Sequence, residues 1–142
     1  MGKKRIVKKG GEESGGSRAA SSRGSKRRME NGVLTVEATY NNTKVALADT
    51  AGNIVTWSSS GSLGFAGAKK GTPFAAAKVG ELIGERALGM GVKEVSVVVA
   101  GVGAGRESSI RAFATKGIHI SSIKDMTPVP HNGPRAPKPR RV

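Results

Sequence analysis

The positive charge of this chain is concentrated at its two ends, and this distribution constrains its fold more than any other feature. Residues 1–28 carry ten Lys or Arg and two acids, and residues 131–142 carry four Lys or Arg and no acid. The 102 residues between them hold ten basic residues against eight acids. Most of the net charge of +14 therefore lies on the ends. The nearly neutral middle can fold compactly, whereas we expect the ends to stay extended until an anion neutralises them.

The length of 142 residues is typical of one domain. We expect a basic flexible extension over 1–30, an α/β domain over 31–126 and a basic proline-rich tail over 127–142. The extension is rich in Gly and Ser and has no apolar periodicity, so we expect it to be disordered in isolation. Five prolines between 128 and 139 prevent regular structure in the tail. No apolar run approaches the ~18 residues of a membrane span, so we expect no membrane association.

Alternating apolar residues predict three antiparallel strands in the first half of the domain. Residues 33–40 place one set of side chains on one face, and the turn Asn41-Asn42 leads into a strand over 43–49. A third strand is expected over 54–58. We expect Trp57 to lie in the core, and the buried face of the first strand to comprise Leu34, Val36, Ala38 and Tyr40.

A glycine- and serine-rich loop over 58–71 precedes a helix that Thr72-Pro73 begins and that Gly89 and Gly91 end. One face of this helix carries an apolar stripe of Ala75, Val79, Leu82, Ile83, Ala87 and Met90. Another face carries only small residues, Ala76, Gly80 and Gly84. Mid-helix glycine costs about 1 kcal/mol relative to alanine, so we expect another backbone to approach this face closely.

Residues 94–100 form the most apolar strand, which we expect to be central and buried on both faces. A glycine turn, a helix over 106–116 and a strand over 118–124 follow. The order β-β-β-α-β-α-β predicts an α/β fold with a mixed five-stranded sheet and two helices.

The turn Gly101-Val-Gly-Ala-Gly105 has three possible roles. A dinucleotide fingerprint requires G-x-G-x-x-G, and Arg106 occupies a position that breaks this pattern, although Asp125 lies about where a ribose-binding acid would be. The turn could simply fold the helix back onto the sheet. We favour a third role, in which free amides at the helix start, with Arg106 and Arg111, bind a phosphate of a nucleic acid.

Little in the composition supports catalysis. The chain has no cysteine, and its two histidines, His119 and His131, are too few for a zinc site. Four acids could form a two-metal nuclease cluster, but solvated charges or ion pairs explain them more simply: Glu37, Asp49, Glu94 and Asp125. We expect no enzyme activity, no cofactor and no metal.

The polar and basic loop residues point instead to RNA. Lys69-Lys70 could be a solvated pair, but their position before a helix start favours contact with phosphates. Phe65 is either a small core plug, which we favour, or a stacking side chain. His131 and Asn132 could bond to base edges, and the Asn132-Gly133 step is prone to deamidation.

Several segments closely resemble the bacterial form of the ribosomal protein eleven family of the small subunit. They are NNT at 41–43, WSS at 57–59, GFAGAKKGTPFAA at 64–76, GVGAGRESSIRA at 101–112 and TPVPHNGPRAPKPRRV at 127–142. The resemblance covers about residues 30–142. It implies a ribonuclease-H-like fold without nuclease activity and a cytoplasmic protein of the ribosome.

The resemblance also implies a position. Members of the family lie on the platform of the small subunit, bridge helices of ribosomal RNA and help form the messenger cleft that holds the Shine–Dalgarno pairing. Ribosomal proteins seven and eighteen are neighbours, and messenger RNA and initiation factor three lie nearby. The residues alone leave open a general nucleic-acid chaperone or an RNA-binding domain outside the ribosome.

Position by position, the resemblance assigns RNA contacts to Asn41, Asn42, Lys69, Lys70, Arg106, Arg111, His131, Asn132, Arg135, Lys138, Arg140 and Arg141. It also marks Asn132 as a possible site of isoaspartate. This chain departs from the family pattern at Val102 and Ala104, where prolines are common, and at Pro134 and Pro139, where a Cys and a basic residue are common.

Overall fold

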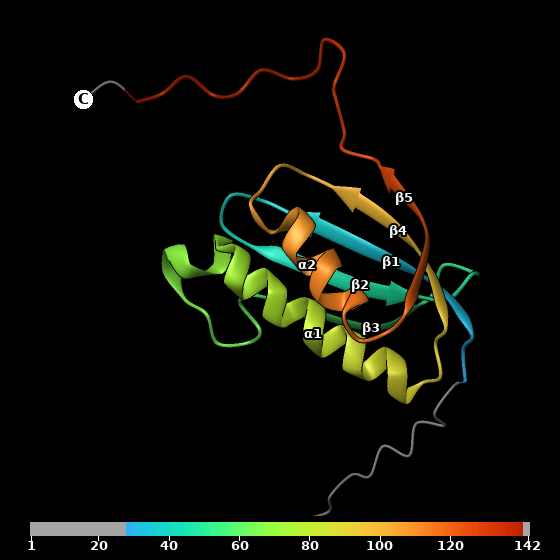
Figure 1. The fold of residues 1–142 in the computed structure, drawn as a ribbon. Coiled ribbons are helices and arrows are strands. Elements are labelled where there is room, and N and C mark those ends of the chain that lie inside the picture. Colours follow the sequence, from blue (N-terminus) through green and yellow to red (C-terminus); the bar gives the residue numbers. More distant parts are fainter. Residues whose placement is uncertain (1–27, 141–142) are drawn as a thin grey trace, which may run out of the picture.

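The computed structural model describes residues 28–140 (Figure 1). The expected disorder of the extension over 1–27 and the proposed contact of Arg141 lie outside the described residues. The element order is β1 (Asn31–Ala38), β2 (Thr43–Ala48), β3 (Ile54–Ser59), η1 (Gly67–Gly71), α1 (Pro73–Gly89), β4 (Glu94–Ala100), α2 (Gly105–Ala114) and β5 (His119–Asp125). The predicted α/β class and order are confirmed, and the short 3-10 helix η1 is an addition within the expected loop.

The five strands form one mixed sheet in the order β3-β2-β1-β4-β5. β1, β2 and β3 pair antiparallel, as expected from the tight turns between them. β4 pairs parallel with both β1 and β5, and the two helices provide the crossovers. Both helices pack on the same face of the sheet (Figure 1), so no element of residues 28–140 covers the opposite face.

The core lies between the sheet and the helices. β1 contributes Leu34 and Val36, and the helices contribute Val79, Ile83 and Phe113, all of them fully buried. Successive side chains of a strand point to opposite faces, so the alternate residues lie on the uncovered face.

Three burial predictions are wrong. Trp57 is 59% exposed, because it lies on the uncovered face while the small Ser58 points inward. Tyr40 is 81% exposed, because β1 ends at Ala38 and the chain has already entered the turn. β4 alternates between buried and half-buried residues, and β1 is the central strand.

The two helices meet along the small-residue face of α1, which confirms the predicted close approach. A Cβ atom on Gly80 would collide with the carbonyl oxygen of Ser109 in α2, and one on Gly84 would lie 2.7 Å from Cγ of Lys116. α1 begins as predicted, since the Thr72 hydroxyl accepts a hydrogen bond from the Ala75 amide at 3.3 Å. Two members of the predicted apolar stripe, Leu82 and Met90, are only half-buried.

Candidate nucleic-acid interface

The loops that carry most of the predicted RNA-binding residues meet at one edge of the sheet. β1, β4 and β5 are parallel, so their carboxyl ends lie together (Figure 1). We call this the loop edge, defined by the turn over 39–42, the segment over 60–72, the turn over 101–104 and the chain from residue 126 onward. In open α/β sheets, ligands characteristically bind beyond the carboxyl ends of the strands.

Glycines allow these loops to pack backbone against backbone. A Cβ atom on Gly71 would collide with the carbonyl oxygen of Tyr40, and one on Gly101 would collide with that of Ala38. A Cβ atom on Gly103 would be too close to the carbonyl oxygen of Thr39. Larger residues at these positions would push the loops apart.

Packing also explains the third glycine of the predicted turn. A Cβ atom on Gly105 would collide with the Thr43 hydroxyl at the start of β2. The N-cap residue of α2, Ala104, provides no side-chain cap. The structural role of the turn therefore accounts for all three glycines, and phosphate binding at this helix start stays a prediction. Asp125, the residue at the position of a ribose-binding acid, bonds to Arg106 instead, which argues against a dinucleotide site.

Asn41 and Asn42 differ in their surroundings. Asn42 is half-buried and its side-chain oxygen accepts a hydrogen bond from the Gly61 amide at 3.4 Å. Its backbone amide donates to the Thr39 hydroxyl, and its carbonyl accepts from the Thr39 amide at 2.8 Å. Asn41 is exposed at the tip of the turn. Asn42 thus ties two loops together, and Asn41 faces solvent.

Lys69 and Lys70 lie in the last turn of η1. Both the amide and the hydroxyl of Thr72 donate to the Lys69 carbonyl, at 3.3 and 2.7 Å, which holds η1 against the start of α1. The aliphatic part of Lys70 packs over Gly61 at the position a Cβ atom would contact. Neither lysine pairs with an acid within residues 28–140, so both ammonium groups are available to an external anion.

Phe65 does not belong to the core, so its expected role as a core plug is wrong. It is half-buried and meets the exposed ring of Phe74 edge-on, with ring centres 6.1 Å apart. Lys78 lies over the Phe74 ring, 5.6 Å from its centre. The two rings stabilise the segment before α1.

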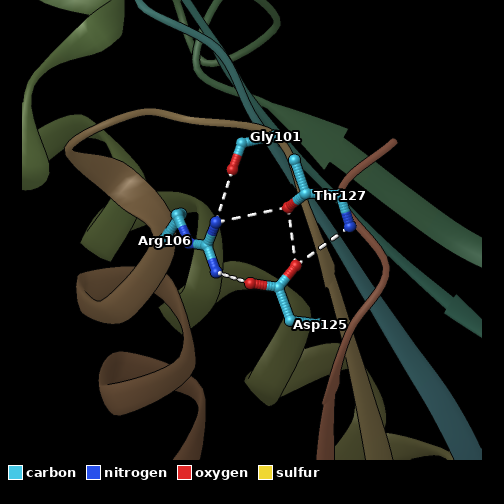
Figure 2. A network of polar contacts seen from close by, with 4 residues as sticks. All are labelled: Gly101, Arg106, Asp125 and Thr127. Carbon is cyan, nitrogen blue, oxygen red and sulfur yellow. Dashed lines mark hydrogen bonds and ion pairs between the residues drawn. The ribbon is translucent and has the colours of Figure 1, made fainter. Parts of the chain in front are cut away.

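Arg106 reaches across the loop edge to the end of β5 (Figure 2). Its Nη2 donates to Oδ2 of Asp125 at 2.6 Å, and its Nη1 donates to the Gly101 carbonyl at 2.6 Å and to the Thr127 hydroxyl at 3.4 Å. The other carboxylate oxygen accepts from the Thr127 hydroxyl at 2.6 Å and from the Thr127 amide at 2.9 Å. The Thr127 hydroxyl and Arg106 hold the pKa of Asp125 well below its usual range, so the carboxylate is ionised.

Sequence reasoning missed the role of Thr127. An acid followed two residues later by Thr is the signal for a side chain that accepts a hydrogen bond from the backbone two residues on. The link to Arg106 depends on the parallel register of β4 and β5, which pairs Val99 with Asp125.

Arg111 does not join Arg106, although the sequence predicts that they act together. Five residues along a helix correspond to about 1.4 turns, so the two side chains leave different faces of α2. Arg111 pairs with Glu107 and lies beside the groove between α1 and α2.

The tail leaves the loop edge directly. The Met126 amide donates to the Val99 carbonyl at 2.8 Å, and residues 128–140 make no hydrogen bond to the domain. Figure 1 shows this segment running away from the fold in extended form. Asn132 has a positive φ of 53°, a conformation that asparagine tolerates. The predicted RNA-binding residues of the tail are all exposed: His131, Asn132, Arg135, Lys138 and Arg140.

Three of the four acids of the alternative nuclease site bond to separate partners, and the fourth, Glu94, begins β4 without an ion pair in the described residues. Glu37 pairs with Lys44 at 3.9 Å, and Asp125 pairs with Arg106. Asp49 accepts from the Asn53 amide at 2.9 Å, and hydrogen bonds from Asn53 lower the pKa of this carboxyl. Within residues 28–140, no three His, Cys, Asp or Glu side chains gather as metal ligands. No helix in this part of the chain is long and apolar enough to span a membrane.

Comparison with known proteins identifies the family. Residues 32–141 match the family model described as ribosomal protein S11. Small ribosomal subunit protein uS11 of Gloeobacter violaceus is 51% identical over 117 residues, which cover 82% of this chain and 90% of that protein. The family match includes nearly all of the α/β domain and most of the tail. The chain therefore belongs to the ribosomal protein S11 family, and it is a structural protein of the small ribosomal subunit rather than an enzyme.

Proposed function

We propose that this protein binds ribosomal RNA through the loop edge and the basic tail. This proposal rests on one observation: most of the basic side chains in residues 29–140 that lack an acidic partner lie at or beside this edge or in the tail. Of the ten Lys and Arg in residues 29–130, six pair with acids, and Arg86 donates to Thr56 and to the Trp57 carbonyl. The remaining three lie at or beside the loop edge: Lys69, Lys70 and Lys124.

The tail continues this surface. Its basic side chains have no acid in the same segment, and they start from the edge that carries the unpaired lysines. Neutralising phosphates with such residues releases counterions, which favours binding and makes the affinity depend steeply on salt. The folded domain then fixes where the charges begin, and the tail becomes ordered along the RNA.

The finer assignments follow from the family. We propose a place on the platform of the small subunit, where the protein bridges ribosomal RNA helices and borders the messenger cleft for Shine–Dalgarno pairing. Ribosomal proteins seven and eighteen are the proposed neighbours, with messenger RNA and initiation factor three nearby, in the cytoplasm. The strand order β3-β2-β1-β4-β5, with three antiparallel strands followed by two parallel ones, supports the ribonuclease-H-like description. The exposed Asn132, followed by Gly133, supports isoaspartate formation there.

The binding experiment compares unpaired with paired lysines. The full chain is titrated with a small-subunit ribosomal RNA transcript at several salt concentrations. Replacing both Lys69 and Lys70 by Gln should weaken binding and reduce the slope of log affinity against log salt by about 1.5, because each phosphate contact contributes about 0.7–0.9. The matched control, Lys44→Gln with Lys93→Gln, removes the same charge from paired sites and should leave the slope nearly unchanged.

Sedimentation separates the ribosomal function from a general chaperone. The protein should migrate in stoichiometric amounts with small subunits. A flat salt response, or equal affinity for unrelated RNA without comigration, would contradict the proposal.

A further inference from the structure

We infer that Arg106 is a positioning residue that sets the direction in which the basic tail leaves the domain. Together with Asp125, Thr127 and the carbonyl of Gly101 it forms what we call the tail clamp (Figure 2). This inference rests on the proposed RNA binding, because it assigns the clamp a part in that function. It replaces a direct phosphate contact of Arg106 with an action through the tail.

The end of β5 needs such a restraint. Among the described residues β5 is an edge strand that pairs with β4 alone, and nearly all its side chains are exposed. The last backbone hydrogen bond of the sheet joins Met126 to Val99. Beyond it, the interactions that connect the chain to the domain are those of Thr127 with Asp125 and Arg106, within the described residues.

The clamp connects two parts of the chain that are about 20 residues apart in sequence. Arg106 lies in the first turn of α2 and Gly101 directly follows β4, whereas Asp125 is the last residue of β5. Both carboxylate oxygens of Asp125 accept hydrogen bonds, and the Thr127 hydroxyl donates to one of them while accepting from Arg106. A closed set of charge-assisted bonds fixes the orientation of each side chain.

The base of the clamp is itself rigid. Gly101 has a φ of 91° and lies so close to the carbonyl of Ala38 that no Cβ atom would fit. The carbonyl that receives Arg106 is therefore held against the central strand β1. Through Arg106, Thr127 is therefore held at a fixed position relative to the sheet.

The sequence after the clamp preserves the direction that it sets. Thr127 is followed by Pro128, Val129 and Pro130. Proline fixes its own φ and keeps the preceding residue extended, so such segments behave as semi-rigid spacers. A fixed exit angle thus places the basic residues of the tail in a limited region, which lowers the entropy lost when RNA orders them.

Asp125→Asn provides the sharpest test, because direct phosphate binding by Arg106 and positioning by the clamp predict opposite changes in RNA affinity. The variant gains positive charge and releases Arg106, so direct phosphate binding by Arg106 predicts equal or tighter binding of RNA. The clamp predicts a dissociation constant about fivefold higher for the ribosomal RNA transcript, with an unchanged salt slope. Thr127→Val removes the hydroxyl bonds without changing charge, and it should produce a similar loss.

Controls separate the clamp from charge and from folding. Glu94→Gln gains the same charge at an acid without an ion pair in the described residues, at the start of β4, and it should bind no more weakly than wild type. Thermal unfolding should show that Asp125→Asn and Thr127→Val remain folded at the assay temperature. Equal or tighter binding by both variants would overturn the inference. A salt slope reduced by about one in Arg106→Gln would show that Arg106 itself binds a phosphate, and would overturn it too.

A second readout needs no RNA. Because the chain has no cysteine, Thr50→Cys and Ala136→Cys allow two spin labels, one on the domain and one on the tail. Their distance distribution should broaden when Asp125→Asn is added, and an unchanged width would overturn the clamp. If wild-type protein fails to bind the transcript, the proposed function fails, and the spin-label distances still decide whether the clamp exists.

Discussion

The folded domain and its tail differ in how far their positive charges are neutralised by acidic partners. In the domain, Lys44, Lys78, Lys93, Arg106, Arg111 and Lys116 each pair with an acid. In the tail, Arg135, Lys138 and Arg140 are exposed and have no acid in the same segment. We therefore propose a division of roles: the domain supplies a rigid frame with a few unpaired lysines at its loop edge, and the tail supplies most of the net positive charge in residues 29–140 that binds RNA. Variants can therefore change one without the other.

The largest effect is expected on the frame. Gly80→Val places a side chain against the Ser109 carbonyl, which belongs to a helix that cannot move without disturbing the core. We expect the free energy of unfolding to fall by about 3 kcal/mol or more, since overpacking of a close contact costs about 1–3 kcal/mol and backbone offers little relief. Urea denaturation followed by circular dichroism measures this change.

Gly89→Ala is the matched control in the same helix. A Cβ atom there would have no neighbour within 4 Å, so we expect stability to stay the same or rise slightly. If both variants lost equal stability, the contact between α1 and α2 would not be the reason. RNA affinity of Gly80→Val should be normal at temperatures where the variant is folded, because the substitution leaves the tail unchanged.

The next largest effect is expected on RNA affinity when the positive charges of the tail are removed. Replacing Arg135, Lys138 and Arg140 by Gln should weaken RNA binding about 100-fold at low salt and reduce the salt slope by about two, because three phosphate contacts are lost. The melting temperature should not change, since residues 128–140 make no hydrogen bond to the domain. Binding titrations and thermal unfolding measure the two properties separately.

The comparison depends on a control with the same charge. Lys44→Gln, Lys93→Gln and Lys116→Gln also remove three positive charges, but from residues that pair with acids. This variant should bind RNA within a few-fold of wild type. If it lost as much affinity as the tail variant, net charge rather than location would govern binding, and the division between frame and tail would fail.

The sequence predicted the frame well because its signals are local. Alternation predicts the strands, Thr72-Pro73 predicts the start of α1, and Gly80 and Gly84 predict the close approach of another backbone, which the structure identifies as that of α2 at Ser109. Local signals do not say which face of a strand is covered. Trp57 and Ser58 alternate as any strand does, and only the placement of both helices on one side exposes the larger residue.

The site was less predictable because it depends on partners distant in sequence. Arg106 is a basic residue at a helix start, and the neighbouring acid, Glu107, pairs with Arg111 instead. Its partner Asp125 lies 19 residues away, and the register of β5 against β4 brings the two together. That Lys69 and Lys70 have no acidic partner within residues 28–140 is equally non-local, because it depends on where the acids of the folded domain lie.

The smallest effect is expected at the junction of frame and tail. The pKa of Asp125 is depressed in the folded protein, so its contribution to stability is present above the unfolded value of about 3.9 and is lost as pH falls through the folded pKa. The stability difference between wild type and Asp125→Asn should thus be constant from about pH 7 to pH 5 and shrink below about pH 4. Denaturant unfolding at each pH measures it.

Asp49 does not obscure this result. Its pKa is also lowered, by hydrogen bonds from Asn53, but it is present in both proteins and cancels in their difference. Because Asp125 is half-exposed, solvent screens its interaction with Arg106 and limits the effect. A difference that stayed constant down to pH 3 would mean that the ionised carboxylate is not what holds Arg106 and Thr127. In that case the tail would start from a free end, and frame and tail would be independent rather than joined at a fixed angle.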